Sequence, residues 1–403
     1  MEWKEVRLGD IADVQTGPFG SQLHKSDYIA EGIPCIMPTN IGSHLNFIVD
    51  GIAHVSEVDA NRLSRHLTEF GDIIYARRGD IEKCAYVTTN EEKWLCGTGC
   101  LKIRCNNGVN SRFIAYQLST AECKKWITGN AVGTTMLNLS KGILSNLPLL
   151  VPSHEDQRRI ASILSSLDRK IELNNKINAD LEEMAQAIFK NWFVDFEPFK
   201  DGKFVDSELG MIPEGWKVGT LGDITNNKSA KVKERNDVKV LSPVTSGELV
   251  LSEEYFTKQV FSSSIAKYKI VNKGDFAYNP ARVNIGSLGR NEFDFYGCVS
   301  PVYVVFSVLE GYENYFDLFR KTDFFKDSVA SLAIGGVRQS LSYDDLSLIE
   351  TIIPSKNIVE KFNNLYNQMK KTIKANKLEN SRLSLLRDTL LPRLMSGELE
   401  VPE

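Results

Sequence analysis

Two polar segments of the chain carry side chains that can bind the edges of nucleic-acid bases. They occupy the same place in an internal repeat, at residues 133–138 and 335–340. Arginine can form two hydrogen bonds to guanine, glutamine can form two to adenine, and threonine can bond a base or contact the methyl group of thymine. The alternative is that both segments are Gly-rich turns. The candidate contacts are Thr134, Thr135, Asn138, Arg338, Gln339 and Ser340.

Further segments add amide, hydroxyl and cationic groups. Residues 17–25, with the sequence Gly-Pro-Phe-Gly-Ser-Gln-Leu-His-Lys, combine backbone flexibility with side chains that can bond bases or phosphates. A pair of arginines follows a predicted strand at residues 72–75, where it can contact phosphate or form a charged turn. A similar segment follows Tyr278 in the second half. The candidates from these segments are Ser21, Gln22, Lys25, Arg77, Arg78, Arg282 and Asn284.

Motifs for catalysis are missing from the sequence. It contains no GxxxxGK[ST] phosphate loop, no GxGxxG and no HExxH. Asn279-Pro280 is similar to the motif with which adenine methyltransferases hold a flipped base, but it lacks the second proline and the aromatic residue that stacks on the base. We interpret it as a turn after a strand. The chain is therefore predicted to bind a ligand without catalysing a reaction, with a cryptic enzyme site near Asn279 or Cys96 as an alternative.

The cysteines do not indicate a metal site. The one metal-like spacing is Cys96-x3-Cys100-x4-Cys105, and no histidine or second CxxC pair lies near it to complete a tetrahedral site. Six of the seven cysteines lie in the first half of the chain. Halves that share a fold but not their cysteines do not need disulfides, which favours buried thiols in a reducing compartment.

These candidate residues sit in a chain that repeats itself. Gly133, Leu139, Ser140 and Pro152 return 202 residues later, and Trp3-Lys4 before Leu-Gly-Asp-Ile returns as Trp216-Lys217. A period of this length is too long for a solenoid. Both halves show short strand-like runs separated by turn residues, followed by predicted helices at 111–128 and 314–329. The repeat indicates a duplicated mixed α/β domain, each copy followed by a long helix.

The two long helices show a heptad pattern of apolar residues that begins after Pro152 and after Pro354. Asn174 and Asn178 in the first helix match Asn376 and Asn380 in the second, and buried asparagine fixes the register of a coiled coil. The helices most simply run antiparallel, with a domain at each end; a compact helical layer is the alternative. The coiled-coil and partner candidates are Leu164, Leu167, Ile171, Asn174, Leu181, Met369, Ile373, Asn376 and Leu383.

Composition fits a cytoplasmic globular protein with two or three domains. The chain has 403 residues, a formal net charge of −4 and no apolar run long enough to span a membrane. A negative net charge argues against a protein that coats nucleic acid by bulk attraction alone. Basic residues nevertheless cluster in both halves, near Arg62, Arg77, Lys124, Lys231 and Lys370. Each cluster alone is more often a solvated surface than a phosphate track.

Several local phrases, in this order along the whole chain, resemble a known family. They lie at residues 17–21, 155–160, 181–193, 213–216, 335–341 and 386–397, and they include Gly-Pro-Phe-Gly-Ser, Glu-Asp-Gln-Arg-Arg-Ile and Gly-Gly-Val-Arg-Gln-Ser-Leu. The chain resembles the DNA-specificity subunit of type I restriction-modification systems. It departs from the pattern at residues 226–240, where the second half has a Lys-rich stretch instead of a Gly-Pro-Phe-Gly-Ser loop.

The resemblance implies an α+β fold with two similar target-recognition domains, separated by two long helices that form an antiparallel coiled coil, in a pseudo-twofold internal duplication. The expected boundaries are domain 1 at 1–152, a central helix at 153–196, a linker at 197–213, domain 2 at 214–354 and a C-terminal helix at 355–397. Each domain would read one half of a bipartite, asymmetric site on double-stranded DNA. A protein scaffold with incidental DNA contact is the alternative.

The resemblance also implies partners and assigns the chemistry to them. Two methyltransferase subunits would bind the helices and carry S-adenosylmethionine, so no cofactor is expected in this chain. Whether restriction subunits, which act as motor and nuclease, also join the complex is left open. The chain itself would be a non-catalytic specificity subunit.

Overall fold

The computed structural model describes residues 2–133, 137–256, 258, 260–262, 264–332 and 340–401. Two compact units emerge from the contacts within the chain. Unit 1 consists of Met1–Asn175 with Asn376–Glu403, and unit 2 of Lys176–Ala375. Each unit is larger than the domain expected from the sequence, because it also includes half of each long helix.

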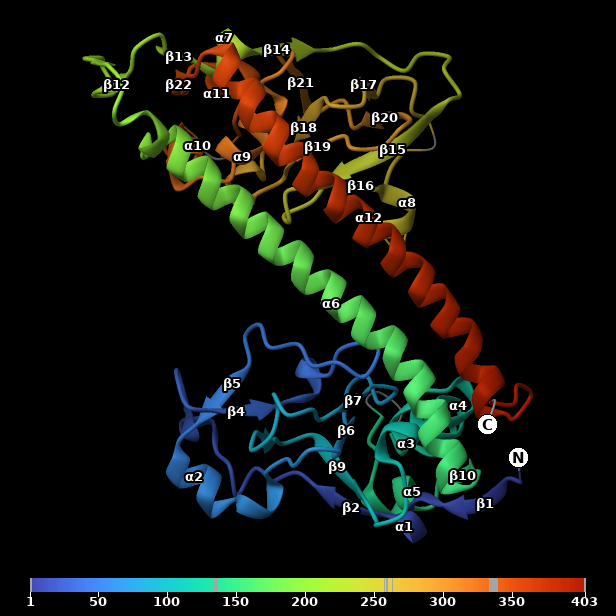
Figure 1. The fold of residues 1–403 in the computed structure, drawn as a ribbon. Coiled ribbons are helices and arrows are strands. Elements are labelled where there is room, and N and C mark those ends of the chain that lie inside the picture. The colour runs from blue at the N-terminus through green and yellow to red at the C-terminus, as the bar shows by residue number, and fades with distance from the viewer. Residues whose placement is uncertain are drawn as a thin grey trace. The chain divides into compact units, whose positions relative to one another are not determined.

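Unit 1 contains two four-stranded sheets and a two-stranded ribbon in its described part (Figure 1). The strand orders are β2-β9-β6-β7, β3-β5-β4-β8 and β1-β10. The strands are β1 (Lys4–Arg7), β2 (Ala12–Thr16), β3 (Tyr28–Ile29), β4 (Ile33–Ile36), β5 (Ala53–Val55), β6 (Ile73–Ala76), β7 (Cys84–Tyr86), β8 (Leu95–Cys96), β9 (Cys100–Cys105) and β10 (Pro148–Val151). The helices are α1 (Leu8–Ile11), α2 (Glu57–Arg62), α3 (Ser111–Leu118), α4 (Ala121–Asn130) and α5 (Lys141–Ser145), with short 3-10 turns η1 (Lys25–Asp27), η2 (Pro38–Asn40) and η3 (Ser64–His66).

Unit 2 repeats the first sheet as β14-β21-β18-β19 and the ribbon as β13-β22, and adds the ribbon β11-β12. Its second sheet, β16-β15-β20-β17, repeats the pairing of β5-β4-β8 in its first three strands but carries its fourth strand at the opposite edge. Its strands are β11 (Phe204–Val205), β12 (Ile212–Pro213), β13 (Lys217–Thr220), β14 (Thr225–Lys228), β15 (Val238–Pro243), β16 (Leu249–Leu251), β17 (Lys269–Val271), β18 (Phe276–Tyr278), β19 (Leu288–Arg290), β20 (Tyr296–Val299), β21 (Val304–Val308) and β22 (Glu350–Ile353). Its helices are α7 (Leu221–Ile224), α8 (Ser252–Tyr255), α9 (Glu313–Phe319), α10 (Asp323–Leu332) and α11 (Tyr343–Ser347), with the 3-10 turns η4 (Glu197–Phe199) and η5 (Val283–Ile285). The mixed fold and its duplication, both predicted from sequence, are confirmed by the strand order of the first sheet and of the ribbon, and the edge strand of the second sheet is where the two units differ.

The single helices predicted at 111–128 and 314–329 are wrong, because each is two helices. In unit 1 the hydroxyl of Thr120 accepts a hydrogen bond from the amide of Cys123 and caps α4. In unit 2 the hydroxyl of Thr322 accepts from the amide of Phe325, just inside α10. A Thr cap satisfies amides that a continuous helix would bond to its own backbone. The apolar periodicity hid both breaks.

The two long helices are α6 (His154–Phe193) and α12 (Lys356–Met395), drawn green and red in Figure 1. Ser153 caps α6 by accepting a hydrogen bond from the amide of Asp156 at 3.2 Å. Among the described residues, neither these helices nor any other has the length and apolar character needed to cross a membrane. Each long helix begins in one unit and ends in the other, so its packing is described unit by unit.

In unit 1 the two helices meet through polar groups as well as apolar ones. The amide of Asn174 donates to Asn380 Oδ1 at 2.9 Å and to Glu379 Oε2 at 2.8 Å. Farther along, Arg387 Nη1 donates to Asp168 Oδ1 at 3.1 Å. Since earlier residues of α6 meet later residues of α12, the helices are antiparallel here. The heptad match alone did not reveal that Asn174 pairs with Asn380.

In unit 2 the same two helices are joined by aromatic rings. The ring of Phe362 lies 5.0 Å from that of Phe193, 6.0 Å from Trp192 and 6.2 Å from Phe189, centroid to centroid. The late part of α6 thus packs on the early part of α12, again antiparallel. Among the predicted coiled-coil residues, Leu164, Asn174 and Met369 are buried, and those that are half-buried are Leu167, Ile171, Leu181, Ile373, Asn376 and Leu383.

Candidate nucleic-acid interface

In unit 1 the turn after β6 is joined to the segment before α5. The amide of Leu139 donates to the carbonyl oxygen of Arg77 at 2.9 Å, and Arg78 forms an isolated antiparallel bridge with Asn138. Asn138 and Val132 exchange two backbone hydrogen bonds, of 2.9 and 3.2 Å, which hold this segment in place. Three of the predicted contact residues, far apart in sequence, therefore lie together.

The loop at residues 17–25 is anchored beside this turn. The hydroxyl of Thr98 donates to the carbonyl oxygen of Pro18 at 3.0 Å, and Arg62 Nη1 donates to that of Gln22 at 2.8 Å. A Cβ atom at Gly17 would lie 2.2 Å from the carbonyl oxygen of Gly97, so only glycine fits this close approach. The Gly-Pro-Phe-Gly sequence thus allows the loop to pack tightly against the strand connection before β9.

A cation–π contact links the loop to the turn. The guanidinium carbon of Arg77 lies 6.0 Å from the centre of the Phe19 ring, at the outer limit for such contacts, and the ring is 56% exposed. Arg77 Nε and Asn138 Oδ1 are buried, and neither has a hydrogen-bond partner within the described part of the chain. Since buried polar atoms are normally paired, a ligand that bonds both would satisfy them. The turn thus combines a base-sized aromatic face with two unsatisfied polar atoms.

The other predicted residues of the loop differ in what they offer. Ser21 and Lys25 are exposed, as is Arg78 at the turn. Gln22 is half-buried, and its Oε1 accepts a hydrogen bond from the amide of Phe19 at 3.2 Å. The Gln22 side chain therefore stabilises the loop, and its carbonyl is not free to read a base.

Unit 2 builds the same arrangement from different residues. The amide of Leu341 donates to the carbonyl oxygen of Pro280 at 3.1 Å, which matches the bond from Leu139 to Arg77. The turn closes where Asn279 donates to the carbonyl oxygen of Ser287 at 3.1 Å. Asn279-Pro280 therefore lies in a turn after a strand, as predicted. Arg282 and Asn284 are exposed on this turn, and Ser340 is exposed beside Leu341.

Some predicted residues cannot be placed. Thr134 and Thr135 in the first half, and Arg338 and Gln339 in the second, lie outside the described residues. In both halves a described residue that follows the segment reaches the turn of its own unit: Asn138 bridges Arg78, and Leu341 bonds Pro280. Their assignment as base contacts stays a prediction.

Sequence reasoning missed the residues that position the loop in unit 1. Phe19, Arg62 and Thr98 were not among the candidates, although each contacts the 17–25 loop or the Arg77 turn. Arg62 and Gln22 are 40 residues apart, and Thr98 and Pro18 are 80 apart. Spacing carries no signal for such contacts. The exposed Phe between two glycines was the one available hint.

Most of the basic clusters are occupied by neighbouring carboxylates. Arg62 pairs with Asp59 at 2.7 Å, Arg235 with Asp237 at 2.6 Å, and Lys370 with Glu292 at 2.7 Å. Surface pairs of this kind contribute little to stability, but they lower the local positive field. The solvated-surface interpretation is therefore favoured for these clusters, and the turn residues are the stronger DNA candidates.

The cysteines are free thiols, and burial raises the pKa of Cys96 to about 12. In the part of the chain that the structure describes, no three His, Cys, Asp or Glu side chains gather in a way that could hold a metal ion. The pKa of Cys100 is also raised by burial. Both thiols are in the protonated, unreactive form at neutral pH.

Comparison with known proteins shows what this chain is similar to. A family model described as "Type I restriction modification DNA specificity domain" matches residues 1–183. The MjaIX specificity subunit of a type I restriction enzyme from Methanocaldococcus jannaschii is 28% identical, with all of this chain and 94% of the relative covered. The HindI specificity subunit from Haemophilus influenzae is 25% identical over 99% of this chain and the full length of the relative. The first 183 residues thus match this family's model, and the whole chain is similar to specificity subunits of type I restriction enzymes.

The crystal structure of a type I restriction-modification S subunit from M. genitalium shares the fold. The TM-score is 0.62 at 15% identity, and the match covers 98% of this chain and 96% of that one. This likeness confirms the predicted fold class. The similar proteins are specificity subunits, which agrees with the prediction of a non-catalytic subunit. The turns of units 1 and 2 are accordingly candidate recognition surfaces rather than active sites.

Proposed function

We propose that this specificity subunit reads a bipartite, asymmetric DNA site, with one half contacted by the turn of unit 1 and the other by the turn of unit 2. The observation that supports this most is the repeated bond from Leu139 to Arg77 and from Leu341 to Pro280. The same backbone frame carries different side chains in the two units. Because the two turns carry different side chains, they would select two different DNA half-sites.

Each turn offers groups suited to DNA. Arg78 in unit 1 and Arg282 in unit 2 are exposed cations, which can bond guanine or phosphate. Asn138 and Asn284 carry amides, which can form two hydrogen bonds to adenine. Because the chain has a net charge of −4, its own attraction for DNA is weak and partner subunits would supply further phosphate contacts.

The partners follow from the family. We propose that two methyltransferase subunits bind the long helices and that S-adenosylmethionine is held by those subunits. Exposed leucines on the helices support a docking role: Leu173 is 52% exposed, Leu378 54% and Leu385 71%. A restriction subunit would join the same complex where the system also cleaves DNA.

Co-expression with the companion methyltransferase subunit tests this function. Adenine methylation is mapped across genomic DNA by single-molecule sequencing, with cells lacking this chain as the control. We expect a two-part motif with a fixed spacer, present only when this chain is present. A stable complex that methylates without a motif would contradict the proposal and favour a scaffold role.

A further inference from the structure

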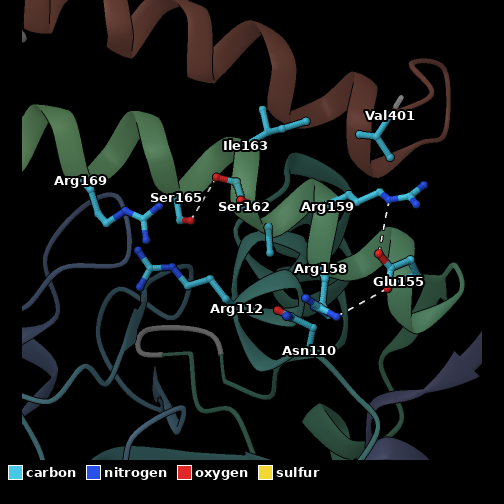
Figure 2. A pocket seen from close by; sticks show the side chains of 11 residues that line it. Asn110, Arg112, Glu155, Arg158, Arg159, Ser162, Ile163, Ser165, Arg169 and Val401 are labelled. Atoms are coloured by element: carbon cyan, nitrogen blue, oxygen red, sulfur yellow. Dashed lines mark hydrogen bonds and ion pairs between the residues drawn. The ribbon is translucent and has the colours of Figure 1, made fainter. Parts of the chain in front are cut away.

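A second polar site lies in unit 1, in a hollow of about 610 Å³ between α3 and the first turns of α6 (Figure 2). Arg112 comes from α3, and Arg158, Arg159 and Arg169 come from α6. Among the described residues that line it, Glu155 is the one with a carboxylate. The hollow is therefore strongly positive, in a chain whose net charge is negative.

Two of the four arginines, Arg158 and Arg159, already pair with carboxylates of α6. Glu155 lies 3.6 Å from Arg158 and 3.5 Å from Arg159, and Asp156 lies 3.8 Å from Arg159. For Arg112 and Arg169, no carboxylate of the described residues lies within ion-pair distance. Figure 2 shows both guanidinium groups directed into the same space, one from α3 and one from α6. Two like charges held this way favour an anion between them.

Arg112 is held in place before any ligand arrives. Its guanidinium carbon lies 4.4 Å from the centre of the Tyr86 ring and 5.6 Å from that of Tyr116. Its Nε is buried, and the described part of the chain offers it no hydrogen-bond partner. Stacked arginine loses little freedom when it binds a carboxylate or a phosphate. The buried Nε is a donor that a ligand would satisfy.

The remaining lining favours a peptide over DNA. Ala161, Ile163 and Val401 form an apolar part of the hollow, which a phosphate backbone would not use. The hollow also lies at the opposite end of β6 from the Arg77 turn, because Tyr86 pairs with Ile73 at the start of that strand. DNA that contacts the Arg77 turn is therefore not brought into the hollow by that contact.

We propose that this hollow binds an acidic segment of a protein partner, with two carboxylates on Arg112 and Arg169. The partner meant is the methyltransferase subunit, so this proposal rests on the proposed function for its source. The second half lacks the equivalent of Arg112, because the residue 202 positions later is Asn314, which is bonded to Asn363 and Asn367. Two identical subunits would therefore bind differently at the two ends of this chain.

Binding to an array of peptides that tile every acidic segment of the methyltransferase subunit tests the site, with the full chain as the analyte. We expect at least one peptide to bind, Arg169→Glu to weaken it at least tenfold, and Arg169→Lys to weaken it less. Arg382→Glu, a charge reversal at an exposed arginine of α12 in the same unit, is the matched control and should leave binding unchanged.

Three results would overturn the proposal: no acidic peptide binds, Arg169→Glu binds as the unaltered chain does, or a DNA duplex displaces the peptide competitively. The last would assign the hollow to nucleic acid. The proposed function can fail separately, since a complex without a methylation motif leaves peptide binding to the hollow unchanged. Native circular dichroism of each variant shows that a loss of binding is not a loss of fold.

Discussion

Units 1 and 2 share the strand order of their first sheet but hold their part of the helix pair by different means. In unit 1, Arg387 is 4% exposed and bonds Asp168, whose other oxygen accepts the hydroxyl of Tyr116. In unit 2, Phe362 packs among Phe189, Trp192 and Phe193. Directional polar contacts fix which residues meet, whereas apolar burial provides more stabilisation per side chain. In unit 1 the polar contacts fix the register of the two helices, and in unit 2 the aromatic packing supplies most of the stabilisation between them.

The aromatic cluster should show the largest effect. Phe362→Ala leaves a cavity among the rings of Phe189, Trp192, Phe193 and Tyr366 and should lower the stability of unit 2 by about 3 to 5 kcal/mol. Hydrogen exchange measured by mass spectrometry should show faster exchange in peptides of unit 2 than of unit 1. Leu365→Ala on the same helix, where the side chain is 38% exposed, should change stability by less than about 1 kcal/mol. If hydrogen exchange becomes faster by the same factor in both units, the aromatic cluster does not stabilise unit 2 in particular, contrary to this account.

The buried ion pair should rank second. Arg387→Met leaves Asp168 without its cation and should destabilise unit 1 by about 3 kcal/mol. The double variant Asp168→Leu/Arg387→Met should recover most of that loss, because no charge stays buried. Urea unfolding followed by exchange in unit 1 peptides measures both. If the double variant is no more stable than the single one, the contact contributes packing and not charge pairing.

The asparagine contact should have a smaller effect. Asn174→Ala removes hydrogen bonds to Glu379 and Asn380 and should cost about 1 to 2 kcal/mol. Glu172→Ala, at an exposed position two residues earlier on the same helix, is the control. Thermal unfolding of the three proteins gives the ranking. If Asn174→Ala lowers the stability of the protein as much as Phe362→Ala does, the polar contacts of unit 1 stabilise the helix pair as strongly as the aromatic packing of unit 2, which would contradict this account.

The smallest effect should be a dependence on pH that is confined to unit 1. Burial lowers the pKa of His66 to about 4, helped by the nearby charges of Arg65 and Lys102, and burial also lowers the pKa of His44 beside Arg387. Unfolded histidine titrates near 6.5, so below that pH the unfolded state binds more protons and the stability of unit 1 falls until about pH 4. Unit 2 contains no histidine.

Hydrogen exchange at pH 7.5 and pH 5.5, corrected for the intrinsic rate, measures this difference. His66→Gln should reduce the pH dependence in unit 1 while leaving unit 2 unchanged. A similar pH response in both units would show that carboxylates, and not these histidines, control it.

The repeat made the architecture predictable from sequence, but the contacts between distant residues were not. Leu139 and Leu341 are 202 residues apart and each is followed by serine, so the sequence places them at the same position of the repeat. In both units the amide of this leucine bonds a carbonyl oxygen of the turn. By contrast, Arg387 meets His44 across 343 residues, and the heptads could not tell Asn380 from Asn376 as the partner of Asn174. Such pairings depend on how elements pack, which periodicity does not encode. Thr120 and Thr322 are residues that commonly cap a helix, so the sequence did contain a signal for both breaks. The apolar periodicity on either side of each threonine nevertheless suggested one continuous helix.

The central claim is that each unit reads its own half of one DNA site. The most direct measurement is the methylated motif produced by three forms of the chain in the same co-expression system: unaltered, Arg78→Ala/Asn138→Ala, and Arg282→Ala/Asn284→Ala. The account predicts that the first double variant relaxes or abolishes specificity in one half of the motif and that the second affects only the other half. Changes in the same half, or an unchanged motif in both variants, would contradict it.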